Sequence, residues 1–341
     1  MPETRDAPTT GTINNVVIFI RFAGESEFGQ NISTYDGWFN SNASSQKNYF
    51  LEASYNQLTV NSHFYPVPSS GFVVSWQDSN PRSYYQPYHA TTNPNGYNGD
   101  TERRNREFTL LGNACNGVNS AIPSNLVIDS DNDGRVDNVV FVISGSSDGW
   151  SDLLWPHRWA IYDRTVYLRG KRVYDFNLQL RDFLNSQNVG VICHEFFHTL
   201  GAPDLYHYTS NGISPVGSWD LMEANTNPPQ HMGAYMKHKY GNWISSIPTI
   251  TADQAYTLNP LTMSTGQAYR INSTHPNQYY VMEYRRKMGT FENSLPGSGL
   301  LVYRIDTRYN GNASGPPDEV YLYRPMVLLR LMAASVARTS A

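Results

Sequence analysis

The stretch from Cys193 to Asp204, which reads CHEFFHTLGAPD, constrains this chain more than any other. An α-helix turns once in about 3.6 residues, so His194 and His198 lie one above the other on a single helix face. Two imidazoles at this spacing can bind one Zn²⁺, and Glu195 then lies beside the metal without binding it. A carboxylate in that position can take a proton from metal-bound water. The motif therefore predicts zinc-dependent hydrolysis with Glu195 as general base, and an ordinary amphipathic helix with surface histidines is the alternative.

The residues after His198 are expected to reverse the chain. Gly201 can adopt the left-handed conformation of a helix C′ position, and Pro203 cannot continue the helical hydrogen-bond ladder. Asp204 would then return to the metal as its third ligand and leave the fourth position open for water. Glu223 is the alternative ligand, because some zinc peptidases take a glutamate from a later helix. Glu223 lies in a segment rich in Asn and Pro, so we favour Asp204.

An acidic loop between residues 129 and 137 predicts a structural Ca²⁺ site. Carboxylates occupy its first, third, fifth and ninth places, and a glycine at the sixth allows the sharp turn of a wrapped calcium loop. An EF-hand would need Glu at the twelfth place, where this chain has Val140, so the loop is of another kind. An acidic turn without an ion is the alternative, although clustered carboxylates repel one another unless a cation neutralises them. The expected ligands are Asp129, Asp131, Asp133, the carbonyl of Arg135, and Asp137.

Length and composition define the class of protein. The 341 residues can bury a sizeable core, and we expect one large domain with a smaller module. Hydrophobic residues make up 40% of the chain and charged residues 16%, which is typical of a globular protein with the polar, uncharged surface often seen outside the cell. The net charge of −4 argues against a nucleic-acid partner.

The compartment stays open at the level of composition. No apolar run reaches the roughly 18 residues that a membrane span needs. The start of the chain lacks the apolar region of a signal peptide, so either the protein is cytosolic or a signal peptide and pro-region have been left off. The two cysteines, Cys115 and Cys193, allow at most one disulfide, and we expect Cys193 to be a buried thiol.

The order of predicted elements separates four regions. An apolar, β-branched run over 14–22 predicts a buried central strand, and residues 78–106 read as a long polar loop. Beyond residue 248 short strands are predicted at 255–258, 278–284 and 299–305. The expected regions are a polar tail over 1–13, a catalytic domain over 14–248, a β-rich module over 249–325 and an unassigned tail over 326–341.

Further residues are candidates for the site. Peptide hydrolysis usually needs a second donor for the oxyanion, and His157, Tyr208 and His231 are candidates that the sequence does not rank. For His157, a packed histidine between two tryptophans is the preferred interpretation. Met222 lies where a Met-turn would pass under the zinc ligands, although a lone methionine is more often core filler.

Taken together, these motifs resemble the immune inhibitor A-type family of secreted bacterial zinc metallopeptidases. The resemblance extends from the first strand to about Pro325. It rests on the HExxHxxGxPD core, the acidic loop before a strand, Trp-Pro-His at 155–157, GSWDLM at 217–222, Glu-Tyr-Arg at 283–285 and LPGSGL at 295–300. It implies an α+β fold, with a zincin-like catalytic domain of mixed twisted sheet and active-site helix before the β-rich module. It also implies export, Glu195 as general base, zinc ligands His194, His198 and Asp204, and Ca²⁺ at the acidic loop.

We therefore expect a secreted zinc-dependent endopeptidase that acts as a monomer on protein or peptide substrates. Two alternatives come from other classes of protein. One is a calcium-stabilised extracellular binding or adhesion protein with a vestigial zinc site, against which the intact Glu195 argues. The other is a zinc hydrolase of non-peptide amides, which a panel of substrates would distinguish from a protease.

Overall fold

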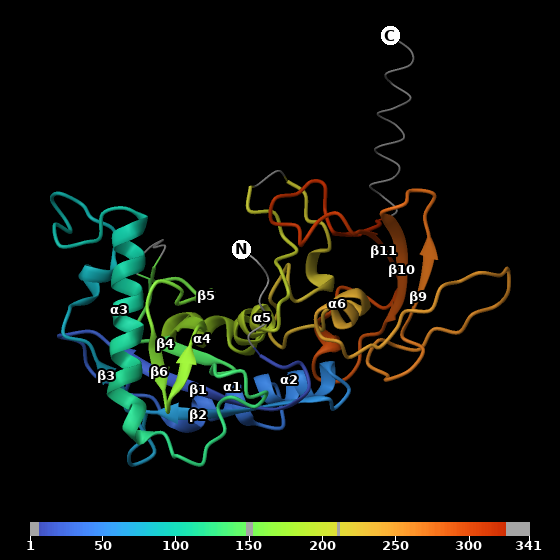
Figure 1. Ribbon diagram of the computed structural model, residues 1–341. Coiled ribbons are helices and arrows are strands. Elements are labelled where there is room, and N and C mark those ends of the chain that lie inside the picture. Colours follow the sequence, from blue (N-terminus) through green and yellow to red (C-terminus); the bar gives the residue numbers. More distant parts are fainter. Residues whose placement is uncertain (1–6, 148–152, 210–211, 325–341) are drawn as a thin grey trace, which may run out of the picture. The chain divides into compact units, whose positions relative to one another are not determined.

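The computed structural model describes residues 7–147, 153–209 and 212–324, and its secondary structure is mixed α/β (Figure 1). The chain divides into two compact units, with the division after Gly201. The sequence predicted a division after residue 248, and that domain assignment stays a prediction. The earlier division has a physical reason, because residues just after Gly201 bond to the end of the described chain, as when Asn312 N–H donates to the Asp204 carbonyl. The tail over 326–341 lies outside the described residues.

The first unit is built on a largely parallel sheet with the strand order β2, β1, β4, β8, β5. Its strands are β1 (Gly11–Arg21), β2 (Leu58–Tyr65), β3 (Trp76–Gln77), β4 (Val139–Ile143), β5 (His157–Ala160) and β8 (Asp175–Leu180). β1 pairs in parallel with β2, β3 and β4, and β4 pairs in parallel with β8. β5 lies antiparallel beside β8 at the edge of the sheet. A separate antiparallel ladder joins β6 (Val166–Leu168) to β7 (Lys171–Val173).

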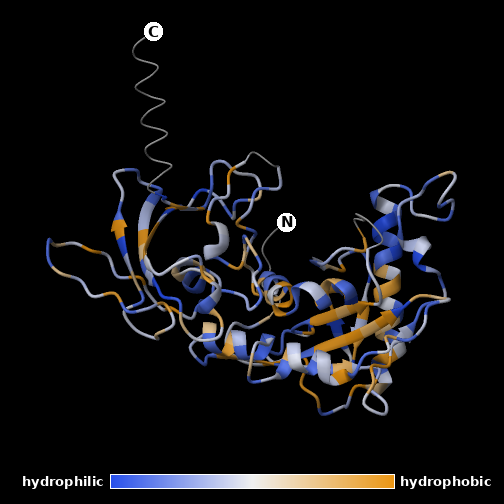
Figure 2. Ribbon diagram, turned by 180° about the vertical axis from the view of Figure 1, so that it is seen from behind, coloured by the Kyte–Doolittle hydropathy of each residue, from blue (hydrophilic) through white to orange (hydrophobic). Residues whose placement is uncertain are grey.

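β1 is the buried central strand that the apolar run predicts. Residues Val16 to Ile20 are all 0% exposed, as expected for a strand whose sheet is covered on both faces. The strand begins at Gly11, inside the expected polar tail, and Ala7 and Thr9 before it are buried as well. Packed structure therefore begins earlier in the chain than the polar composition of residues 1–13 suggests. Figure 2 shows the apolar character of the central strands.

Helices cover both faces of this sheet (Figure 1). The helices on one side are α1 (Ile32–Asn40), α2 (Gln46–Ala53), α4 (Arg181–Gln187) and α5 (Val189–Thr199). On the other side lies α3 (Asp100–Val118), whose Phe108 belongs to the same core cluster as Ile18. Alternate residues of β1 serve the two cores, since Val17 and Phe19 belong to the cluster on the side of α1, α4 and α5.

Residues 78–106 differ from the long loop predicted for them. A 3₁₀ turn forms over Arg82–Tyr85, and α3 begins at Asp100. The first turn of α3 carries Asp100 and Glu102, where negative charge interacts favourably with the helix dipole. No side chain caps this end, because the residue before it is Gly99. A polar first turn without a recognisable cap is the reason that composition alone suggested a loop.

The second unit contains a four-stranded antiparallel sheet in the order β12, β11, β10, β9. Its strands are β9 (Ala268–Asn272), β10 (Gln278–Arg285), β11 (Gly299–Asp306) and β12 (Val320–Leu322), and a short helix, α6, covers Ala234–Lys239. The strands predicted at 278–284 and 299–305 are confirmed, whereas residues 255–258 form none. Alternate residues of β10, among them Glu283 and Arg285, are buried. Within the described ranges, no helix is both long enough and apolar enough to cross a membrane.

Candidate metal centre

α5 carries the predicted zinc motif and ends where the sequence predicts. The helix runs from Val189 to Thr199, and Gly201 N–H donates to the carbonyl of His198 at 2.9 Å. Gly201 has φ +97°, a conformation that residues with a side chain rarely adopt. The chain therefore reverses directly after the helix, and Asp204 follows from this turn.

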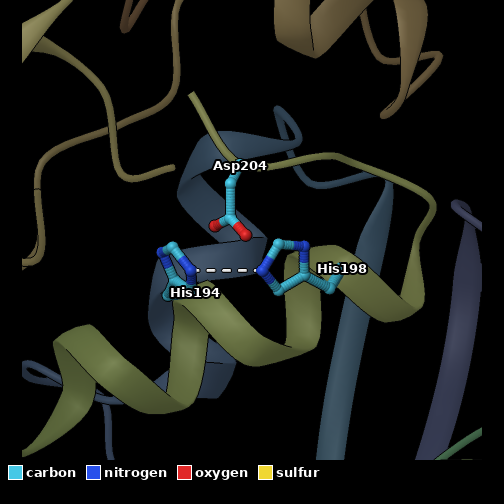
Figure 3. A group of neighbouring side chains, drawn as sticks. All are labelled: His194, His198 and Asp204. Atoms are coloured by element: carbon cyan, nitrogen blue, oxygen red, sulfur yellow. Dashed lines mark hydrogen bonds between the residues drawn. The ribbon is translucent and has the colours of Figure 1, made fainter. Parts of the chain in front are cut away.

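His194, His198 and Asp204 form one group of possible metal ligands (Figure 3). One ligand atom from each residue lies within 4.8 Å of the others, and the two histidine Nε2 atoms are 3.2 Å apart. Two nitrogens at about 2.05 Å from one tetrahedral Zn²⁺ would be separated by about 3.3 Å. The spacing of the imidazoles thus fits a single zinc ion, and Asp204 adds the carboxylate oxygen that a three-ligand catalytic site needs.

The C-terminal turn of α5, which carries the second histidine, is fixed to its surroundings on two sides. Phe196 packs edge-to-face against Phe50 of α2, with ring centroids 4.8 Å apart. The hydroxyl of Thr199 accepts a hydrogen bond from Asn177 Nδ2 of β8 at 3.1 Å and donates to Asn138 Oδ1 at 3.4 Å. All five side chains are buried, so the position of the turn is set by the core and not by solvent.

The two carboxylates proposed as third ligand have different partners. Asp204 is 7% exposed, and its Oδ2 accepts a hydrogen bond from the Tyr208 hydroxyl at 2.6 Å. Glu223 instead closes its own loop, because its Oε2 accepts the backbone N–H groups of Val216 and Gly217. The group of possible ligands around the two histidines includes Asp204 and not Glu223 among the described residues.

Glu195 lies on α5 between the two histidines and is 7% exposed. His157, at the start of the edge strand β5, has an acceptor at each of its ring nitrogens. Nδ1 is 2.6 Å from the Trp155 carbonyl oxygen, and Nε2 is 2.8 Å from Oε1 of Glu107. Burial alone would lower the pKa of His157, but the Glu107 carboxylate, the Trp155 carbonyl and the charge of Glu195 together raise it. The acceptor at each ring nitrogen and the raised pKa both favour the imidazolium form of His157.

Glu107 is the residue in this arrangement that sequence reasoning missed. It is 0% exposed and lies on α3, directly before the buried Phe108. Burying a carboxylate in the apolar face of a helix costs free energy unless a cation compensates its charge. A glutamate among the apolar residues of α3 was therefore the sequence feature that could have indicated a buried cationic partner. His157 lies 50 residues further along the chain, so no local spacing pointed to the pair.

The acidic loop brings three of its carboxylates together. Ligand atoms of Asp129, Asp131 and Asp137 lie within 4.8 Å of one another, with the first and last buried. Asp133 lies outside this group, and its backbone N–H donates to Asp129 Oδ1 at 3.0 Å. Its carboxylate accepts the N–H of Arg135 at 2.7 Å, which shapes the turn. Of the expected aspartate ligands, the structure therefore places three in one group and the fourth beside it.

The charges of this loop are incompletely neutralised. Burial, followed by the neighbouring charges of Asp131 and Asp129, raises the pKa of Asp137 to about 6. Burial would also raise the pKa of Asp129, but the ammonium of Lys171 at 2.7 Å and the N–H of Gly134 bring it below its ordinary value. One lysine thus offsets part of the repulsion, and a bound cation would offset the rest.

Two further residues singled out by sequence lie inside the second unit. His231 is 0% exposed, and Lys237 Nζ lies 3.3 Å from its Nδ1. Burial, reinforced by Lys237, lowers the pKa of His231 well below its ordinary value, so the ring is neutral and packed and does not line a cleft. Met222 is also buried, and its carbonyl accepts the N–H of Leu205 at 2.9 Å. Met222 therefore lies beside the residue that follows Asp204.

Two histidines four residues apart, a glutamate directly after the first and an aspartate beside them form an HExxH arrangement, which is the motif that metallopeptidases use to hold a metal ion. Residues 130–244 match the family model of the immune inhibitor A peptidase M6 catalytic domain, which confirms the resemblance carried by the motifs. Immune inhibitor A from Bacillus thuringiensis subsp. alesti is 26% identical over an aligned stretch that covers 34% of this chain. That stretch spans 20% of the length of the relative.

Proposed function

We propose that this protein is a secreted zinc-dependent endopeptidase. The observation that carries the proposal is the convergence of His194, His198 and Asp204 on one point, with Glu195 on the same helix. The match to a peptidase family over residues 130–244 supports the reaction class. A purely structural zinc site would have no use for Glu195, so the intact glutamate favours hydrolysis over binding alone.

The chain's own residues supply the proton transfers. When bound, Zn²⁺ would lower the pKa of its water toward about 7 and polarise the peptide carbonyl. Glu195 would accept the proton of the attacking water and pass it to the leaving amine. The acceptors at both ring nitrogens of His157 would keep that ring in place and favour its imidazolium form, whose charge attracts the Glu195 carboxylate.

Tyr208 is the second oxyanion donor that this geometry supports best. Tyr208 is 68% exposed, and its hydroxyl reaches the carboxylate of Asp204 at 2.6 Å. A rotation about its side-chain bonds would move that hydroxyl from the ligand to a substrate oxygen at the same metal. The other two candidates lack this freedom, since His157 is bonded at both nitrogens and His231 is buried.

The acidic loop is proposed to bind one structural Ca²⁺ through Asp129, Asp131 and Asp137, with Asp133 and the carbonyl of Arg135 completing the site. The loop directly precedes β4, the strand beside β1 in the sheet, so an ion there would stabilise the unit that carries α5. Protein or peptide substrates, secretion and a monomeric state belong to the same proposal. Their support is the family match and the polar composition of the chain.

The test of the proposed function is proteolysis of an unfolded protein under control of zinc. The purified chain, incubated with the substrate, should produce fragments, lose this activity in a zinc chelator, and regain it when zinc is restored. A preparation of Glu195→Gln purified in the same way controls for contaminating proteases. Activity that survives the chelator, or that the Glu195→Gln protein shares, would contradict the proposal. Cleavage of small amides without cleavage of proteins would assign the site to the amide-hydrolase class.

A further inference from the structure

Asp204 and Leu205 are held by an asparagine that lies 107 residues further along the chain. The backbone N–H of Asn312 donates to the carbonyl of Asp204 at 2.9 Å. Its side-chain Nδ2 donates to the carbonyl of Leu205 at 3.0 Å and to that of Val320 at 2.8 Å, and its Oδ1 accepts Val320 N–H at 3.1 Å. Asn312 is 0% exposed, so water does not replace these bonds readily. One residue thus joins the Asp204–Leu205 peptide to β12.

Gly311, the residue before Asn312, shows how closely the 311–312 turn approaches the segment from Pro203 to Leu205. Gly311 has φ +70°, and a Cβ placed on it would lie 2.5 Å from Cβ of Pro203 and 2.8 Å from the carbonyl oxygen of Asp204. No side chain fits between the segments. The N–H of Gly311 donates to Oε2 of Glu319 at 2.6 Å, and Glu319 is itself fully buried. The 311–312 turn is therefore also held by Glu319.

An aspartate carboxylate lies only two side-chain torsions from its backbone, so its position follows closely from that of the peptide that carries it. A metal site needs its ligands held to within about 0.5 Å of the productive geometry. Asn312 bonds to the carbonyls of both Asp204 and Leu205, so it restrains the backbone that carries the Asp204 carboxylate.

We propose that Asn312 is a positioning residue for the third metal ligand. It fixes the Asp204–Leu205 peptide and thereby sets the affinity of the site for zinc, an inference that rests on the proposed function. The antiparallel sheet of the second unit then has a role in metal binding, because Asn312 is anchored on β12 through Val320. Loosening this anchor should weaken zinc binding without removing any ligand.

The experiment compares the zinc affinity of full-length Asn312→Ala with that of the wild-type protein, measured by competition with a chromophoric chelator. The variant should bind zinc about tenfold to 100-fold more weakly, the usual effect of removing a group that supports a ligand. The visible absorption of the Co²⁺-substituted protein should change as well, since it reports ligand geometry. Proteolytic activity should fall at limiting zinc and recover in excess zinc, with the KM for the substrate unchanged.

Two further variants keep the test decisive. Asn312→Asp retains the acceptor oxygen and loses the donor to Leu205, so it should behave like Asn312→Ala, and it replaces the alanine variant if that fails to fold. Val281→Ala shortens a fully buried side chain of β10, a strand that is not hydrogen-bonded to β12, and should lower the stability of the same sheet. Its zinc affinity and Co²⁺ spectrum should match the wild type.

The outcomes separate the inference from the proposed function. Wild-type zinc affinity in folded Asn312→Ala and Asn312→Asp would overturn the positioning role, and so would an equal loss of affinity in Val281→Ala. The proposed function is tested by His194→Ala instead. If wild-type protein binds zinc no better than His194→Ala, the zinc site itself is wrong, whatever the Asn312 variants do.

Discussion

Tyr208 donates its hydroxyl hydrogen to Oδ2 of Asp204 at 2.6 Å, so two residues that the sequence singled out separately form a pair. If Tyr208 also stabilises the oxyanion, Tyr208→Phe should keep its zinc but lower kcat by about 100-fold, with KM little changed. Steady-state kinetics and zinc analysis of the same preparation measure both quantities. Tyr206→Phe is the matched control, because it removes a hydroxyl from a neighbouring ring whose centroid lies 5.5 Å from that of Tyr208. A loss of zinc in proportion to activity would show that Tyr208 only supports the ligand.

Calcium should stabilise the first unit through the acidic loop. At a Ca²⁺ concentration about 100-fold above Kd, mass action adds about 2.7 kcal/mol to the free energy of unfolding, which thermal melts in millimolar Ca²⁺ and in chelator would detect. Asp137→Asn should abolish this difference, whereas Asp36→Asn, at an exposed position on α1, should retain it. Identical melting curves with and without Ca²⁺ would show that the loop is only an acidic turn.

A buried aspartate should make the stability of the second unit depend on pH. Burial raises the pKa of Asp220 to about 7, although its carboxylate accepts the N–H groups of Gly233 and Met222. The folded state then holds a proton that the unfolded state releases near its ordinary pKa of 3.8. The stabilisation is complete below pH 4 and is lost as the pH rises through 7, and the loss amounts to about 2.6 kcal/mol between pH 5 and pH 8.

Urea unfolding of the metal-free protein at these two pH values measures that loss. Asp220→Asn has no titrating group at this position. The unfolding free energy of the wild type minus that of the variant should therefore fall by the same amount from pH 5 to pH 8. A difference that stays constant over this range would mean that Asp220 is ionised in the folded protein at both pH values.

The identity of the third ligand can be tested by metal content. Asp204→Ala should lose both zinc and activity, because its carboxylate belongs to the group around His194 and His198. Glu223→Gln should keep its zinc, since Glu223 accepts hydrogen bonds within its own loop. Its melting temperature should fall if the loop loosens. The reverse pattern of zinc retention would assign Glu223 as the ligand.

The parts of the site that sequence predicted are those that local spacing determines. The helix over 189–199 and the turn at Gly201 follow from residue types within a dozen positions of one another, and both are present. The acidic loop is equally local, and three of its aspartates converge. The central strand at 14–22 was predictable because a parallel sheet covered on both faces leaves a continuous apolar run.

The parts that sequence did not predict depend on contacts between distant positions. The Glu107–His157 pair joins α3 to β5 across 50 residues, and α3 itself begins in a segment whose polar composition suggested a loop. Asn312 reaches Leu205 across 107 residues through backbone carbonyls, which carry no side-chain signature. Only the paths of β11 and β12 bring these groups together, and a single sequence does not specify them.

The central claim is that Glu195 transfers protons beside a zinc ion that His194, His198 and Asp204 hold. Glu195→Gln preserves the size and hydrogen-bonding shape of the side chain but cannot accept the proton. Purified Glu195→Gln should therefore contain one zinc per chain, as the wild type does, and cleave an unfolded protein at least about 100-fold more slowly. The most direct measurement is turnover of this zinc-loaded variant beside the wild type. Near-normal turnover would contradict the mechanism, and a loss of activity of that size with zinc retained is the predicted result.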